Sequence, residues 1–270
     1  MEKHVALDVV GELFAIPRES MYNTFMSFLF FGVVEFLSSI LYPLMIPTYW
    51  KSFEANQRLK LIIITVSSAH CVVLFYFCYF LYFEQDDFLA KDVFFANTEY
   101  SRYTHSLSAG YFIWDTIIVC RTVPFDAKFL LHGVVCGFNY WIAQRPTLHF
   151  YGYRFLLFEL STPILNLRYL IMLFFGENAR LVAPLGIAFG ISFLCVRILW
   201  GIPLMVGFIQ NILNKISTLT YEEGIDDIVN TIIWCIFGVS ACLMSILNLY
   251  WLFAMISGKT AQEERKQKQL

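Results

Sequence analysis

The chain has 270 residues, of which 58% are hydrophobic, 18% aromatic and only 15% charged, with a formal net charge of −2. Soluble domains are about half apolar and about a quarter charged, so a soluble globular class is a poor fit. A slightly negative chain also lacks the basic excess typical of nucleic-acid binders, so no nucleic-acid partner is predicted.

Long apolar stretches recur along the chain, at residues 22–47, 59–83, 103–121, 128–144, 150–175, 182–213 and 228–257. About 20 apolar residues cross the hydrocarbon core of a bilayer as a helix. An unpaired strand would leave its backbone groups unsatisfied in lipid, so these stretches are all predicted to be helices. The sequence therefore predicts an all-α, polytopic transmembrane protein with about seven helices, of which the third and fourth are short and carry polar residues.

The third stretch carries a polar stripe at spacings of four, three and four residues, formed by Thr104, Ser108, Tyr111 and Asp115. These spacings place the four side chains on one helical face. An ionisable group at mid-bilayer costs roughly 2.5–3.5 kcal/mol, so Asp115 is expected to turn away from lipid. The stripe either lines a substrate cavity or forms interhelical hydrogen bonds, and Gly110 beside it is expected to let another helix approach closely.

The fourth stretch contains a single histidine, His132, within an apolar run. Such a histidine either acts as a nucleophile or general base, or is a hydrogen-bonded core residue. The sequence has no HxxxH or HxxHH cluster, Walker A loop or GxGxxG fingerprint, so neither a metal nor a nucleotide cofactor is predicted.

Pro163 interrupts the fifth stretch, four residues after Glu159. Because proline has no N–H, the Glu159 carbonyl is expected to lose its helical partner, and the helix is expected to kink there. Glu159, Thr162 and Asn166 share one face, whereas Arg168 lies about 180° from Glu159. The segment forms either the inner wall of a cavity or a packing kink stabilised by its neighbours.

Basic residues mark the sixth stretch and the tail. Arg197 lies midway along the sixth stretch and is a candidate partner for Asp115 or Glu159. Among the lysines and arginines outside the stretches, more lie on the side that holds the C-terminus, which places the C-terminus in the cytosol by the positive-inside rule. Lys266 and Lys268 form a KxKxx ending, which is either a dilysine signal for return to the endoplasmic reticulum or a basic flank of the last helix.

Several strings in the chain resemble the TLC-domain family, and the small TLC domain-containing proteins in particular. They are Gly110-Tyr111-Phe112-Ile113-Trp114-Asp115, then Asp126 and His132, then Glu159-Leu160-Ser161-Thr162-Pro163 with Asn166 and Arg168. Ser68-Ala69-His70 is similar to the family's second-span ending, although Ile64 stands where an arginine is usual. The predicted division is an N-terminal segment with the first transmembrane helix (1–49), a TLC domain (50–257) and a basic cytosolic tail (258–270).

The resemblance implies that the last six helices form a barrel around a lipid-sized cavity, in the membrane of the endoplasmic reticulum. Together with the polar stripe, the expected kink of the fifth stretch and an incomplete set of the family's catalytic residues, it favours a role in lipid homeostasis, by binding, sensing or moving a sphingolipid, phospholipid or fatty acyl species. The candidate residues that line this cavity or bind lipid are Ser108, Tyr111, Asp115, Thr162, Asn166, Arg168 and Arg197.

The resemblance also implies an alternative, an acyltransferase that uses coenzyme A thioesters as the ceramide synthases of this family do. Their signature holds a His-His pair followed further along the chain by two aspartates. In this chain the pair falls on His132-Gly133, and the aspartates fall on Glu159 and Thr162. His132 and Glu159 are then the candidate catalytic residues, with acyl-CoA as a substrate and no bound cofactor. A third possibility is a structural membrane protein whose polar faces serve only packing.

Overall fold

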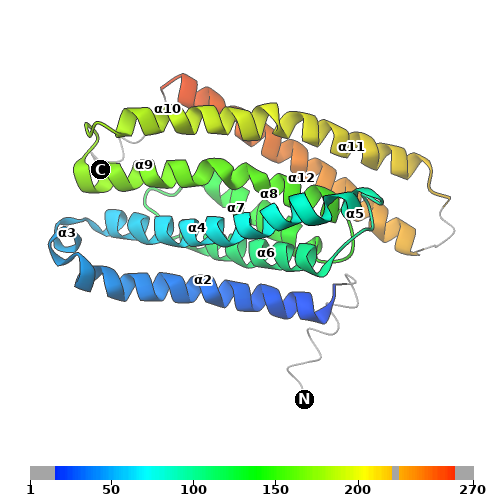
Figure 1. The fold of residues 1–270 in the computed structure, drawn as a ribbon, viewed down its shortest axis with the longest axis horizontal. Coiled ribbons are helices and arrows are strands. Elements are labelled where there is room, and N and C mark those ends of the chain that lie inside the picture. Colours follow the sequence, from blue (N-terminus) through cyan, green and yellow to red (C-terminus); the bar gives the residue numbers. More distant parts are fainter. Residues whose placement is uncertain (1–15, 221–224, 259–270) are drawn as a thin grey trace, which may run out of the picture. The chain divides into compact units, whose positions relative to one another are not determined.

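The computed structural model describes residues 16–220 and 225–258, and the regular elements in these two ranges are all helical (Figure 1). The α-helices are α2 (Arg18–Met45), α3 (Pro47–Ser52), α4 (Ala55–Phe80), α5 (Asp86–Ala90), α6 (Glu99–Val119), α7 (Ala127–Ile142), α8 (His149–Leu156), α9 (Thr162–Phe175), α10 (Val182–Phe193), α11 (Gly201–Ser217) and α12 (Ile225–Ile256). Two π-helices, η1 (Leu81–Gln85) and η3 (Leu194–Leu199), and one 3₁₀-helix, η2 (Leu157–Ser161), join some of them. The KxKxx ending lies outside the described residues.

Within the described ranges, five helical segments are long and apolar enough to span a bilayer: Arg18–Met45, Ala55–Ala90, His149–Phe175, Val182–Ser217 and Asp226–Ile256. These segments coincide with five of the predicted stretches, which confirms an all-α, polytopic membrane protein. The predicted third and fourth stretches are α6 and α7, with 21 and 16 residues, and they are not among the five. Seven crossings and a barrel of six helices stay predictions.

The chain forms two compact units, residues 1–189 and residues 190–270. In the second unit, η3 and α11 both pack against α12. A Cβ added at Gly238 of α12 would lie 3.9 Å from Ile212 Cδ1 of α11, which is ordinary van der Waals contact. Arg197 of η3 donates a hydrogen bond to Asn248 Oδ1 of α12 (3.3 Å). These contacts join the three helical segments of the second unit.

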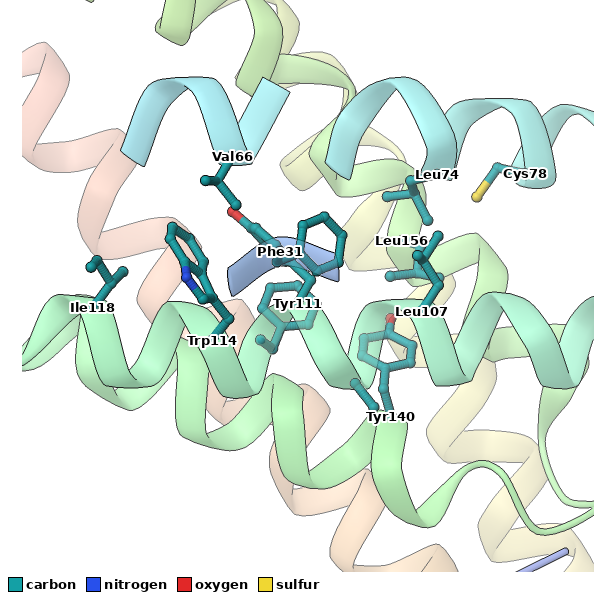
Figure 2. Close-up of a cluster of buried hydrophobic side chains, with 12 residues drawn as sticks. Phe31, Val66, Leu74, Cys78, Leu107, Tyr111, Trp114, Ile118, Tyr140 and Leu156 are labelled. Carbon is teal, nitrogen blue, oxygen red and sulfur yellow. The ribbon is translucent and has the colours of Figure 1, made fainter. Parts of the chain in front are cut away.

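In the first unit, α6 is enclosed by α2, α4, α7 and α8. Every residue from 104 to 112 is buried. Figure 2 shows Phe31, Leu74, Tyr140 and Leu156, one from each neighbouring helix, in the buried apolar cluster around α6. Because protein surrounds α6 over residues 104–112, this part of the helix tolerates serines, a threonine and a histidine that would be costly against hydrocarbon. This enclosure accounts for the polar character of the third stretch.

Gly110 permits the close approach of another helix, as predicted, and that helix is α2. A Cβ added at Gly110 would lie 2.6 Å from the Phe28 backbone nitrogen and 2.6 Å from Ser27 Cβ. Ser27 Oγ donates a hydrogen bond to the Leu107 carbonyl (2.9 Å) at the same crossing. The absence of a side chain at Gly110 therefore sets the distance between α2 and α6.

Pro163 interrupts the α-helical pattern of the fifth stretch, and the consequence differs in one detail from the prediction. The chain tightens into η2 before α9, and Pro163 falls in the first turn of α9, where its missing N–H costs little. The Glu159 carbonyl keeps a partner, because the backbone N–H of Thr162 bonds to it in 3₁₀ fashion. The tighter turn satisfies the carbonyl that an uninterrupted helix would have left unpaired.

Candidate functional site

A stacked pair of rings, His70 of α4 and Tyr111 of α6, lies in the interior of the first unit. Their ring centroids are 3.7 Å apart and their planes differ by 6°. Phe31 of α2 and Phe112 of α6 make T-shaped contacts with His70, at centroid distances of 5.8 and 5.9 Å. His70 is fully buried. Three aromatic neighbours therefore fix the plane of the imidazole.

Two serines of α4 connect this pair to α9. Asn166 Nδ2 donates hydrogen bonds to Ser67 Oγ and to Ser68 Oγ, both at 3.1 Å. The Tyr111 side chain is also hydrogen bonded to Ser67. Asn166 is buried, so its amide gains partners that lipid could not supply. Hydrogen bonds thus tie α4 to both α6 and α9.

Glu159 of η2 completes the polar group. Its Oε2 accepts a hydrogen bond from Thr162 Oγ1 (2.6 Å). The Glu159 carboxylate is close enough to interact electrostatically with His70, Tyr111 and Asp115. We call this group the Tyr111 cluster, and its members are Ser67, Ser68, His70, Tyr111, Asp115, Glu159, Thr162 and Asn166.

Asp115 lies toward α7 within the Tyr111 cluster. A Cβ added at Gly133 would be 3.3 Å from Asp115 Oδ2 and 2.7 Å from Thr116 Oγ1, so the α7 backbone passes close to this carboxylate. The predicted residues Tyr111, Asp115, Glu159, Thr162 and Asn166 are therefore brought together, from α6, η2 and α9.

His132, the candidate nucleophile, is half-buried on α7 beside Gly133. Its ring meets the edge of Phe112 at a centroid distance of 5.5 Å, and its Nδ1 lies 3.7 Å from Cys136 Sγ. Phe112 thus has edge contacts with both His132 and His70. A catalytic role for His132 with Glu159 stays a prediction.

The other predicted residues have different surroundings. Ser108 is fully buried, and its hydroxyl has no hydrogen-bond partner within the described part of the chain. Thr104 donates to the Tyr100 carbonyl of its own helix (2.7 Å). Arg168 reaches toward α10, where a Cβ at Gly186 would be 3.3 Å from its Nε.

Arg197 belongs to the second unit, where it is buried. Its guanidinium donates to Asn248 and lies 5.2 Å from the centroid of the Phe193 ring. The predicted pairing of Arg197 with Asp115 or Glu159 stays a prediction.

Two further histidines, His105 and His149, form a buried pair that the sequence pattern did not indicate. Their ring centroids are 4.5 Å apart. His149 is hydrogen bonded to Ser101 Oγ through Nδ1 (2.7 Å) and to the Arg145 carbonyl through Nε2 (3.0 Å). In the described residues, no group of three or more histidine, cysteine, aspartate or glutamate side chains is arranged to hold a metal ion. The hydrogen bonds of His149 to Ser101 and to the Arg145 carbonyl tie α8 to α6 and to the α7–α8 connection.

His70 is the residue of the Tyr111 cluster that sequence reasoning left out of the candidate site. It is the one histidine of α4, and the polar residues near it, Ser67 and Ser68, are small and common in membrane helices, so the pattern gave no reason to single it out. The only pointer was the similarity of Ser68-Ala69-His70 to a family string.

Comparisons with known proteins find similarity over most of the chain. The family model described as the TLC domain matches residues 60–257. An uncharacterized TLC domain-containing protein of Schizosaccharomyces pombe is 28% identical over 255 residues, which are 93% of this chain and 83% of that protein. TLC domain-containing protein 4 C of Dictyostelium discoideum is 22% identical over 245 residues, covering 88% of this chain and 85% of that protein.

A shorter similarity joins the chain to the protein named topoisomerase I damage affected protein 4 of Saccharomyces cerevisiae. The two are 33% identical over 109 residues, which are 38% of this chain and 39% of that protein. The resemblance read from the sequence strings over residues 50–257 agrees with the range of the family model. With polytopic helices and a family model that covers most of its length, the chain belongs to the TLC-domain family.

Proposed function

We propose that this TLC-domain membrane protein acts in lipid homeostasis, by binding, sensing or moving a membrane lipid whose polar part contacts the Tyr111 cluster. The observation that carries the proposal is the meeting of polar side chains from α4, α6, η2 and α9 inside the first unit. Polar and ionisable residues are costly in membrane helices and commonly mark substrate pathways. A purely structural protein could hold the same helices together with apolar contacts at lower cost.

The proposed location is the membrane of the endoplasmic reticulum, with the C-terminus in the cytosol. The excess of loop lysines and arginines on the side that holds the C-terminus supports this orientation, and the resemblance to the TLC-domain family supports the endoplasmic reticulum. The predicted ligand is a sphingolipid, a phospholipid or a fatty acyl species, held within a barrel formed by the last six helices.

The test is lipid retention by the purified full chain. Wild type should copurify with a defined lipid through detergent exchange, and mass spectrometry of the extract would identify it. Asp115→Asn and Glu159→Gln keep the shape of each side chain while removing its charge, and each should lower the retained lipid several-fold. Glu99→Gln is the matched control, because Glu99 is an exposed carboxylate at the start of the same helix as Asp115. A folded wild-type protein that carries no lipid above the level of a detergent blank would contradict the proposal.

The second candidate function is an acyltransferase that uses acyl-CoA. It is favoured by the electrostatic interaction of Glu159 with a histidine, since a carboxylate beside an imidazole is a common acid–base pair. The histidine in that interaction is His70, whereas the resemblance to ceramide synthases implies His132. Microsomes that contain the chain would be offered labelled acyl-CoA with amine and hydroxyl acceptors. Product that disappears in His132→Ala supports the family-based assignment, and the absence of any acylated product removes the enzyme hypothesis.

A further inference from the structure

The imidazole of His70 is unusual for a residue in the interior of an apolar helix. It is fully buried, and within the described residues neither of its ring nitrogens has a hydrogen-bond partner. A buried donor or acceptor without a partner lowers stability, because it has given up its hydrogen bonds to water. A phenylalanine would make the same ring contacts without that cost, so packing alone does not explain a histidine at this position.

The His70 ring is also held in one orientation. Tyr111 stacks on its face, and Phe31 and Phe112 make T-shaped contacts with it from two other helical positions. Because these rings restrict rotation of the imidazole, the directions of its two nitrogens are fixed before any ligand arrives. A binding group that is already oriented loses little conformational entropy when its ligand binds.

The neighbouring charges narrow the class of ligand. Glu159 interacts electrostatically with both His70 and Tyr111, whereas the interaction of Asp115 is with Tyr111. A phosphate group bound at His70 would be repelled by the Glu159 carboxylate. His70 also lies about 22 Å along the apolar segment that starts at Ala55, where a charged head group would lose its hydration. An uncharged polar group is not repelled by a carboxylate and has no charge whose hydration would be lost.

We propose that the two ring nitrogens of His70 bind an uncharged, hydroxyl-bearing lipid, which rests on the proposed lipid-binding function. A neutral imidazole offers one N–H donor and one nitrogen acceptor. A lipid hydroxyl donates to the unprotonated nitrogen, and an ester carbonyl or a second hydroxyl accepts from the N–H. Acylglycerols carry both groups, while sterols and long-chain alcohols carry the hydroxyl alone. The proposal thus names hydroxyl chemistry as the feature that is recognised, and phosphate head groups as the class that is excluded.

The experiment is photo-crosslinking in membranes that contain the full chain. The probes are diacylglycerol, phosphatidylcholine, a sterol and a long-chain alcohol, each with a photoreactive diazirine, and the first two have identical acyl chains. Wild type should be labelled more strongly by diacylglycerol than by phosphatidylcholine, and unlabelled diacylglycerol should compete. Labelling by the sterol and long-chain alcohol probes shows whether a single hydroxyl is sufficient for binding at His70.

Substitutions at His70 separate binding from packing. His70→Phe keeps the ring contacts and removes both nitrogens, so diacylglycerol labelling should fall about 5-fold to 10-fold, as expected for the loss of one or two hydrogen bonds. The thermal unfolding midpoint of His70→Phe should equal or exceed that of wild type. His70→Gln, which offers an amide donor and acceptor, should retain part of the labelling. Tyr103→Phe is the control, because it removes an exposed hydroxyl from α6 outside the Tyr111 cluster.

The outcomes are distinguishable from those of the broader proposal. Equal labelling of wild type and His70→Phe would overturn the inference. Stronger competition by phosphatidylcholine than by diacylglycerol would also overturn it, and that measurement uses only the wild-type protein. If phosphatidylcholine labels a site that is lost in Asp115→Asn, the proposed function stands and only the hydroxyl assignment fails. If no probe labels the interior of the protein, both fail.

Discussion

Gly110→Ala tests how closely α2 must approach α6. The added Cβ would lie 2.6 Å from the Phe28 backbone nitrogen and 2.7 Å from the Thr24 carbonyl oxygen. Non-bonded carbons normally sit about 3.5–4.0 Å from their neighbours, so α2 has to move outward by about 1 Å. Both close atoms belong to the backbone, so no side-chain rotation can relieve the contact.

The cost of this shift has two parts. Overpacking a close-packed interior costs about 1–3 kcal/mol. Moving α2 by about 1 Å also breaks the hydrogen bond from Ser27 Oγ to the Leu107 carbonyl, now 2.9 Å long, which is worth about 0.5–1.5 kcal/mol. The higher helix propensity of alanine offsets up to about 1 kcal/mol of this loss in the free energy of unfolding. We therefore expect a loss of about 1–3 kcal/mol in the free energy of unfolding.

The measurement is unfolding of the detergent-solubilised protein by titration with sodium dodecyl sulfate, followed by tryptophan fluorescence. Gly32→Ala is the matched control, because Gly32 lies on α2 itself and a Cβ there meets nothing within 4 Å. The control should be as stable as wild type or slightly more so. If Gly110→Ala matches the control, the α2–α6 contact is softer than the structure implies and the reasoning is refuted.

Three further substitutions test other buried contacts by the same unfolding measurement. Gly152→Ala should destabilise the protein, because the new Cβ would overlap His105 Nε2. Adding His105→Ala should recover part of the lost stability, and strictly additive effects of the two substitutions would argue against the contact. Asn166→Leu should cost about 1–3 kcal/mol, because two serine hydroxyls of α4 lose their donor, and an unchanged midpoint would show that those bonds are not formed. Tyr153→Phe should cost about 1 kcal/mol by removing a hydroxyl that donates to Asp86, and a gain in stability would contradict that bond.

The fold class could be predicted because length and hydropathy alone determine which segments can span a bilayer. The five most apolar stretches lie on the five candidate spans, with ends that differ by a few residues. The sequence was least informative at α6, because enclosure by protein removes the need for an apolar surface. A helix that contacts few lipids has fewer apolar residues, and the prediction of membrane spans depends on runs of apolar residues.

The candidate site was predictable in part, for a different reason. Helical spacing identified the face that carries Tyr111 and Asp115, and the cost of an acid in lipid pointed to Glu159. Spacing along one helix does not reveal which residue of another helix lies opposite. His70 was therefore missed, although it stacks directly on Tyr111. The Gly152–His105 contact was missed for the same reason, since nothing in the sequence brings α8 to α6.

Helix α2 packs against the Tyr111 cluster although it precedes residues 60–257, the range of the TLC domain. Phe31 of α2 makes T-shaped contacts with both members of the stacked pair, His70 and Tyr111. Trp114 Nε1 donates a hydrogen bond to Glu35 Oε2 (2.8 Å), which holds α2 against α6 one turn away. Because an edge contact with both rings limits how far either can rotate, the orientation of the His70 nitrogens depends on α2. The geometry of the candidate site is thus a joint property of α2 and the domain, and a change in α2 can shift the His70 ring without touching a residue of the matched range.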